Sequence, residues 1–120
     1  MLKVYGIKNC NTVKKSLSWL EMKNIPYEFF DVKKPVLNES LLNDWMNNIP
    51  SPYTWETLIN KGGMTWRKLP DTKKAMELDL KKAIKLIIEN TSIMKRPVIL
   101  KNNKILTIGF DESEFNKKIS

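Results

Sequence analysis

The spacing of apolar residues changes twice near the start of the chain and predicts a strand, a helix and a second strand. A short apolar run at Leu2–Tyr5 reads as the first strand. Val13, Leu17 and Leu20 then recur at the spacing of an amphipathic helix. Pro26 interrupts that pattern, and the aromatic and β-branched run Tyr27–Val32 reads as the second strand. A strand, a helix and a strand within about thirty residues indicate a βαβ unit with two parallel strands.

The middle of the chain is dominated by helical spacing. We expect a helix that starts after Asn38 and ends before Pro50, a short helix within residues 51–60, a loop over residues 61–70 and a longer helix from about Thr72 to Asn90. The loop is predicted from the Gly62-Gly63 pair and Pro70, and Trp66 and Leu69 can tuck it onto a core.

The last quarter of the chain predicts a hairpin and a terminal helix. The apolar runs Val98–Leu100 and Ile105–Ile108 flank an Asn102-Asn103 turn, which is typical of a β-hairpin. Asp111 then precedes the short helical segment Glu112–Lys118 and is a candidate N-cap, because its carboxylate can accept a hydrogen bond from the first helical turn.

Taken in order, these elements describe an α/β domain with a mixed four-stranded sheet. This order is the thioredoxin-like arrangement with a helical insertion, which we place at about residues 38–92 of a single domain spanning residues 1–120. With 120 residues, 42% of them hydrophobic, the chain can bury one core but hardly a second. We read no basic leader followed by an apolar segment and no apolar run long enough to span a bilayer, so we expect a soluble, cytoplasmic protein without membrane contact.

The positive charge changes this picture little. The net charge of +8 would suit a polyanionic partner, but 19 of the 21 basic residues are lysines scattered through the chain. Specific nucleic-acid recognition tends to use arginine forks or a concentrated basic stripe, so a solvated surface is the better interpretation. Nonspecific, strongly salt-dependent nucleic-acid binding remains a weaker alternative. The two arginines, Arg67 and Arg96, stand out as planar, bidentate donors.

Cys10 is the main candidate for chemistry. It is the only cysteine and falls at the predicted strand-to-helix turn, where free N–H groups and the helix dipole favour an anion. Lys8, Lys14 and Lys15 add positive charge nearby, and such surroundings lower a thiol pKa. The alternative is a buried cysteine that serves as a small hydrophobe. A chain with one cysteine and no histidine can form no intramolecular disulfide and no Cys–His dyad, and we predict no metal site.

Five segments of the chain, in order, match the pattern of a known family: Leu2–Lys15, Trp55–Asn60, Thr65–Leu69, Lys95–Ile99 and Gly109–Glu112. Together they resemble the arsenate reductase (ArsC) and Spx family, and most closely its YffB-like branch of small thiol reductases. The resemblance covers nearly the whole chain and implies a thioredoxin-like fold with a nucleophilic cysteine at Cys10. It also implies a cis Arg96-Pro97 peptide that presents backbone and arginine beside the thiol.

The chain departs from the family pattern in two ways. Arsenate reductases of the family use three arginines, of which only the one matching Arg96 is present; the second falls at Asn60 and the third within residues 107–110. An arsenate ion bound here would lack two charge-assisted hydrogen-bond partners, which argues against arsenate as the substrate. Spx regulators often carry a Cys-x-x-Cys switch, and Val13 occupies its second position here, so no internal disulfide switch can form.

With one thiol and no histidine, the economical hypothesis is a monothiol reductase in which Cys10 forms a mixed disulfide that an external thiol resolves. Glutathione is the expected co-substrate, with no bound cofactor, and its carboxylates would suit Arg96, Lys8 and the free N–H groups of the first helix. The backbone next to Pro97 would pair with the extended tripeptide. Asn11 and Thr12 would supply side-chain donors, or serve only to start the helix.

The main alternative is a binding module. In this Spx-like interpretation, the protein docks on the RNA polymerase α subunit without catalysis, and Cys10 is vestigial or senses redox state. Independently of this interpretation, the alternative to a role of Arg96 at the thiol is a structural ion pair. Arg67 is expected to be structural in either case, packing its loop through the neighbouring Trp66.

Overall fold

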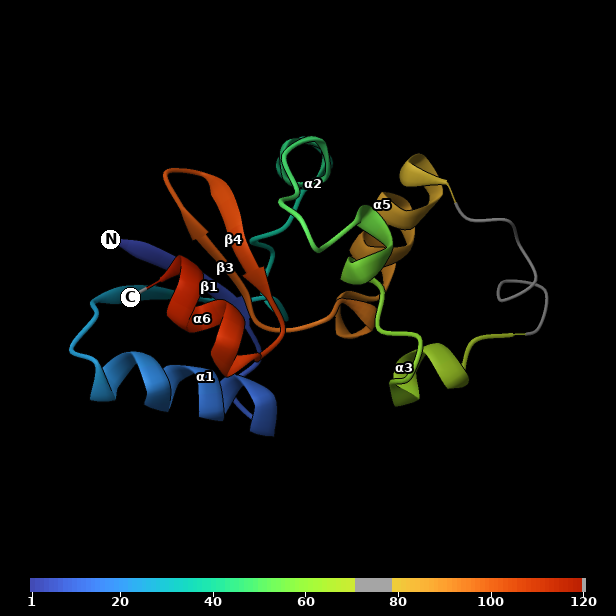
Figure 1. Cartoon of the computed structure of the whole chain (residues 1–120). Coiled ribbons are helices and arrows are strands. Elements are labelled where there is room, and N and C mark those ends of the chain that lie inside the picture. The colour runs from blue at the N-terminus through green and yellow to red at the C-terminus, as the bar shows by residue number, and fades with distance from the viewer. Residues whose placement is uncertain (71–78, 120) are drawn as a thin grey trace.

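The strands form one mixed sheet that confirms the predicted architecture. The computed structural model describes residues 1–70 and 79–119 (Figure 1). The strands are β1 (Leu2–Gly6), β2 (Tyr27–Asp31), β3 (Val98–Lys101) and β4 (Lys104–Ile108), in the spatial order β2-β1-β3-β4. β1 pairs parallel with β2 and antiparallel with β3, and β3 pairs antiparallel with β4. The parallel pair is the expected βαβ unit, with helix α1 (Asn11–Met22) as its connection.

Alternation along the strands separates two apolar clusters on the two faces of the sheet. Leu2 and Val4 of β1 belong to one cluster with Trp19 and Leu20 of α1 and with Phe115 of α6 (Glu112–Lys118). Figure 1 shows α1 and α6 on the same side of the strands, and their Trp19 and Phe115 rings meet edge to face at 5.2 Å. The larger cluster uses the opposite faces of the same strands together with the helices inserted between β2 and β3.

The insertion follows the predicted helical pattern with one correction. Its elements are α2 (Glu39–Asn47), the 3₁₀ turn η1 (Trp55–Leu58), α3 (Met64–Arg67), α5 (Leu80–Glu89) and the 3₁₀ turn η2 (Thr91–Ile93). α2 begins after Asn38 as predicted, and the Asn38 side chain caps it by accepting a hydrogen bond from Leu41 N at 2.8 Å. α5 is the second half of the predicted helix from Thr72 to Asn90, and residues 72–78 of that prediction lie outside the described residues.

The correction concerns residues 61–70, which the glycines and proline predicted to be a loop. One α-helical turn forms there as α3, with hydrogen bonds from Arg67 N to Gly63 O and from Lys68 N to Met64 O. The half-buried Trp66 and Leu69 pack against the larger cluster, as expected. Burial of these two side chains gives a short turn the stability that four residues lack on their own.

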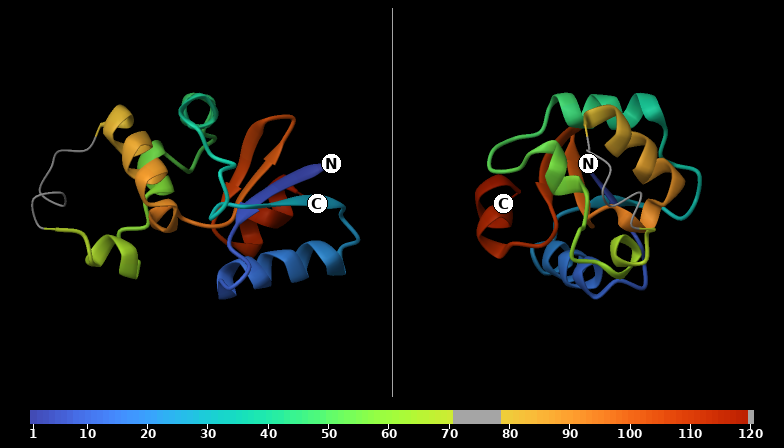
Figure 2. Two further views of the ribbon diagram at one scale, coloured as in Figure 1. Left: turned by 180° about the vertical axis from the view of Figure 1, so that it is seen from behind. Right: turned by 90° about the vertical axis from the view of Figure 1, so that its right-hand side faces the viewer.

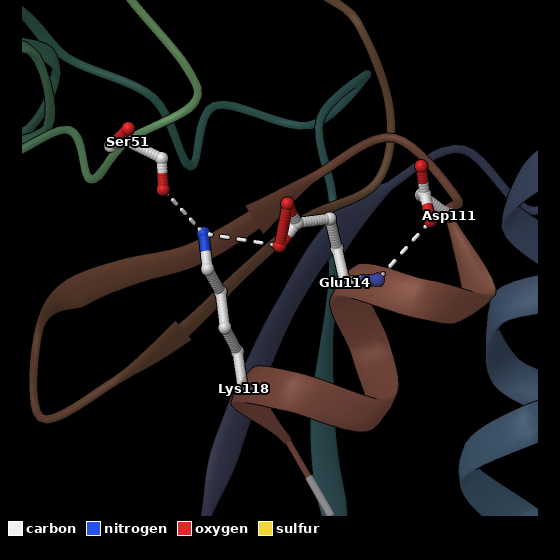
Figure 3. Close-up of polar contacts among 4 residues, drawn as sticks. All are labelled: Ser51, Asp111, Glu114 and Lys118. Atoms are coloured by element: carbon white, nitrogen blue, oxygen red, sulfur yellow. Dashed lines mark hydrogen bonds and ion pairs between the residues drawn. The ribbon is translucent and has the colours of Figure 1, made fainter.

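The C-terminal prediction is confirmed in detail. Asn102 and Asn103 both have positive φ, which is the geometry of a tight hairpin turn with two left-handed residues. The Asp111 side chain accepts a hydrogen bond from Glu114 N at 3.1 Å and caps α6 (Figure 3). Lys118, at the end of α6, donates to the backbone oxygen of Ser51 at 2.8 Å and so ties α6 to the inserted segment (Figure 3).

The two further views in Figure 2 show the inserted helices gathered beyond one end of the strands. Cys10 and Arg96 both lie in connections between the sheet and its neighbouring elements, since β1 ends at Gly6 and β3 begins at Val98. None of the helices described is long and apolar enough to cross a membrane.

Candidate functional site

Cys10 occupies the N-cap of α1, as its place in the sequence predicts. Its backbone is extended, with φ −108° and ψ 123°, and its carbonyl accepts the first helical hydrogen bond from Lys14 N at 2.9 Å. The Cys10 N–H donates to Ile7 O at 3.3 Å, so the turn is held from both sides. The side chain is half-buried. The thiol is therefore neither sealed in the core, as the alternative interpretation would have it, nor freely solvated.

The glycine that ends β1 brings the helix start close to the strand. A Cβ on Gly6 would lie 3.0 Å and 3.2 Å from the two γ-carbons of Val13, which is fully buried in the first turn of α1. Any side chain at position 6 would push this turn away. Gly6 thus contributes to the site by allowing the close packing of strand and helix beneath Cys10.

Opposing effects act on the thiol, and their sum lowers its pKa from the ordinary value. Burial raises the pKa of Cys10, because a thiolate loses hydration. The Val13 N–H, a hydrogen bond from the Arg96 side chain, the positive charge of Arg96 and the Thr12 N–H all favour the thiolate and outweigh burial. The polar groups of one helix terminus and one arginine therefore stabilise the reactive, anionic form.

The site includes Arg96 and Pro97 because β1 and β3 are neighbours in the sheet. Tyr5 of β1 pairs with Val98, the first residue of β3, so the residues just before β3 lie beside the segment that leads into Cys10. The Arg96-Pro97 peptide bond is cis, as the family resemblance implies. The Pro97 carbonyl accepts from Gly109 N at 2.8 Å, which fastens this segment to the end of β4.

Backbone carbonyls hold the Arg96 guanidinium in place. One of its terminal nitrogens, Nη1, donates to Ser92 O at 2.7 Å and to Met94 O at 3.0 Å. Within residues 1–70 and 79–119, its buried Nε has no hydrogen-bond partner. Among the described residues, the arginine is thus anchored by backbone carbonyls in and just after η2, and its Nε is left as an unpaired donor.

The other predicted site residues are near Cys10 in the chain but do not all act on it. Lys8, Asn11 and Thr12 are exposed, and Thr12 reaches the sulfur through its backbone N–H. In the described part of the chain, the causes of the lowered pKa of Cys10 do not include the lysines that the sequence places around it. The backbone N–H of Val13 was not singled out from the sequence, although its position three residues after an N-cap is a usable signal.

The positions that match the missing family arginines are occupied differently. Asn60 lies alongside η2, with its N–H donating to Ile93 O at 2.8 Å, and its amide packs over Gly63. At the other position, Gly109 has a φ of +78°, and the aliphatic part of Lys95 crosses it. Neither arrangement supplies a guanidinium fork.

The donor set does not suit a metal ion. Among the residues that the structure describes, no three histidine, cysteine, aspartate or glutamate side chains gather as a possible ligand group. The chemistry available at the site is that of a stabilised thiolate next to cationic and N–H donors.

Comparisons with known proteins agree with this geometry. The sequence model of the ArsC family matches residues 5–118. An uncharacterised protein of Haemophilus influenzae is 40% identical over 115 residues, which are 96% of each chain. The global transcriptional regulator Spx of Enterococcus faecalis is 26% identical over 98% of this chain and 85% of the regulator. A solved structure of a YffB protein is 32% identical over the full length of both chains, with a TM-score of 0.87. The chain therefore belongs to the ArsC family of thioredoxin-like proteins, and within it to the YffB-like branch.

Proposed function

We propose that this protein is a monothiol reductase that acts through Cys10. The Cys10 thiolate attacks one sulfur of a disulfide, the second sulfur leaves as a thiolate, and a mixed disulfide forms on Cys10. An external thiolate then attacks the substrate-derived sulfur of that mixed disulfide and releases Cys10 as a thiolate. The observation that carries the proposal is the place of Cys10 at the N-cap of α1, where the helix N–H groups and the Arg96 guanidinium lower the pKa of its thiol.

The external thiol is glutathione in this proposal. The chain has a single cysteine, so the second thiol must come from another molecule. Glutathione carries two carboxylates, which suit the Arg96 guanidinium and the exposed Lys8, while Asn11 and Thr12 offer polar contacts at the helix start. In this proposal, the backbone beside Pro97 pairs with the extended tripeptide. A free thiol with this role requires a reducing compartment, so we place the protein in the cytoplasm.

Arsenate is not the substrate that this site suits. Arg96 is the only arginine at the three positions that the family's arsenate reductases use, and the Asn60 amide packs over Gly63. A tetrahedral oxyanion would therefore lack two bidentate partners. A disulfide is neutral and does not need arginine partners to balance its charge.

A second candidate function is an Spx-like regulator that docks on the RNA polymerase α subunit without catalysis. The observation that favours it is the likeness to the Enterococcus faecalis regulator over 98% of this chain. Under this proposal, binding depends on a surface and not on sulfur chemistry, so Cys10→Ser retains it.

The experiment that tests the proposed function measures glutathione-linked reduction of a mixed disulfide between glutathione and cysteine. Wild-type protein is expected to accelerate the reaction and Cys10→Ser to lose all of the acceleration. Thr65→Ser is a matched control, because it places the same side chain outside the site. Absence of acceleration by the wild type, together with capture of purified α subunit by both wild type and Cys10→Ser, would contradict the reductase and support the regulator.

A further inference from the structure

A surface groove follows the exposed side of α1 and begins at the residue after Cys10, although Cys10 itself does not line it. It has a volume of about 880 Å³ and runs from Asn11, the residue after Cys10, to Lys23 at the other end of the helix. Its second wall is the start of α6, with Phe110 and Glu112. Figure 1 shows that α6 and α1 lie on the same side of the sheet. We call it the α1 groove.

The apolar part of the α1 groove consists of two aromatic residues held by ring contacts, Trp19 and Phe110, and one exposed methionine, Met22. Trp19 contacts Phe115 edge to face at 5.2 Å, and Phe115 contacts Phe110 edge to face at 5.0 Å. These contacts fix the two aromatic residues that line the groove. Met22, also in the lining, is 83% exposed, and a methionine side chain can adjust to different apolar partners.

The charged part of the α1 groove is basic. Lys14, Lys15 and Lys23 line it, against the single acidic residue Glu112. Lys23 lies over the Trp19 ring with its Nζ 5.7 Å from the centroid, so a cation borders the aromatic floor. The one acidic residue within α1, Glu21, is outside the lining and accepts from the Tyr27 hydroxyl. A ligand that complements this surface carries negative charge and at least one apolar side chain.

The length of the α1 groove exceeds that of glutathione. From Asn11 to Lys23 the helix rises about 18 Å at 1.5 Å per residue. An extended peptide covers this distance with about five to six residues, whereas a tripeptide spans about 10 Å. A ligand that fills the groove while its sulfur is at Cys10 is therefore a polypeptide.

We propose that the α1 groove binds an acidic, extended segment of a protein substrate, next to a glutathione-modified cysteine in that substrate. This proposal rests on the proposed reductase function and names its substrate class. The Cys10 thiolate attacks the glutathione sulfur, the substrate cysteine leaves as a thiolate, and Cys10 carries the glutathione. A second glutathione thiolate attacks that sulfur, restores the Cys10 thiolate and leaves as oxidised glutathione.

The experiment compares two glutathionylated peptides of about ten residues, long enough to fill the groove on either side of a central cysteine. One has Asp, Glu and one Phe on each side of the cysteine, and the other has Lys in place of each acidic residue. At low salt, the rate constant for release of the acidic peptide is expected to be about tenfold higher, because the lysines attract it. The ratio is expected to fall as salt is added.

The variant Lys15→Glu/Lys23→Glu reverses two charges of the α1 groove and leaves Lys14, one turn from Cys10, in place. It is expected to reduce the acidic-to-basic rate ratio to about one. Lys81→Glu/Lys82→Glu makes the same charge change on the exposed side of α5 and is expected to keep most of the ratio. Equal loss of the ratio in both variants would overturn the proposal, because the preference would then follow net charge alone.

A binding measurement separates this proposal from the reductase function. Cys10→Ser protein is titrated with the acidic peptide carrying Ser in place of cysteine, and backbone amide shifts are followed by NMR. Shifts concentrated in α1 and at Phe110 support the α1 groove even if the wild type reduces no disulfide. Shifts absent from α1, with the small mixed disulfide still reduced by the wild type, overturn the α1 groove and leave the reductase in place.

Discussion

At the scale of single residues, the reactivity of Cys10 depends on a small set of contacts. Burial works against the thiolate, while two N–H groups and one guanidinium work for it. Arg96 differs from the helix N–H groups because a substitution can remove it without changing the backbone. Its Nη1 is anchored on the carbonyls of Ser92 and Met94, so its position is defined before any substrate arrives.

Arg96→Met is expected to raise the pKa of Cys10, because the thiolate loses a hydrogen bond and a nearby positive charge. The measurement is the pH dependence of alkylation by a neutral reagent. The midpoint of the wild-type alkylation curve should lie at a lower pH than that of an ordinary thiol. The variant should therefore react more slowly than the wild type at neutral pH and match it at high pH, where both thiols are ionised.

Arg67→Met is the control for this prediction, since it removes the same charge from an exposed position in α3. Arg96→Lys should give an intermediate midpoint, because it keeps the charge and loses the planar fork. An unchanged alkylation midpoint in Arg96→Met would show that the guanidinium does not face the sulfur.

At the scale of elements, the site depends on how closely α1 approaches the end of β1. Val13 fills the space that a side chain at position 6 would need, and it is fully buried. A β-branched side chain has few rotamers available, so Val13 cannot swing aside to make room. Val13 and the first turn of α1, which follows Cys10, would have to move by a few tenths of an ångström to relieve the contact.

Gly6→Ala is expected to lower the free energy of unfolding by about 1–3 kcal/mol, the usual range for overpacking a core. Urea denaturation measures the change. Gly62→Ala is the matched control, because its added Cβ would meet nothing closer than 3.7 Å, the Oδ1 atom of Asn60. Equal stability of Gly6→Ala and the wild type would mean that α1 adjusts without cost.

At the scale of the whole molecule, α6 connects the sheet to the inserted segment through one lysine. Lys118 Nζ contacts Ser51 O at 2.8 Å, Glu114 Oε2 at 3.5 Å and the face of the Tyr53 ring at 4.7 Å from its centroid (Figure 3). Ser51 and Tyr53 belong to the segment between α2 and η1. The contact therefore joins parts of the chain that are more than sixty residues apart.

Lys118→Met is expected to lower the free energy of unfolding by about 1 kcal/mol, because it removes a cation–π contact and a charge-assisted hydrogen bond and keeps the aliphatic stem. The comparison is with Lys117→Met, which removes the same charge from the exposed neighbouring position. Urea denaturation of both variants measures the difference. Equal effects of the two substitutions would show that Lys118 acts through net charge and not through its contacts.

Local patterns in the sequence predicted most of the elements because they depend on neighbouring residues. The Asn102-Asn103 turn and the cap at Asp111 form as expected, since each involves only a few successive positions. The helical turn at α3 was missed because it depends on Trp66 packing against a distant cluster. The cis Ser51-Pro52 peptide was not predicted either.

By itself, the sequence determined that one cysteine stands at a strand-to-helix turn, with no second thiol and no histidine to assist it. The tertiary structure decided which groups face that sulfur. Arg96 is 86 positions away in the chain and reaches Cys10 because antiparallel pairing of β1 with β3 places the two connections side by side. The lysines next to Cys10 in the sequence are solvated instead, since a helix start directs N–H groups, and not neighbouring exposed side chains, toward its cap.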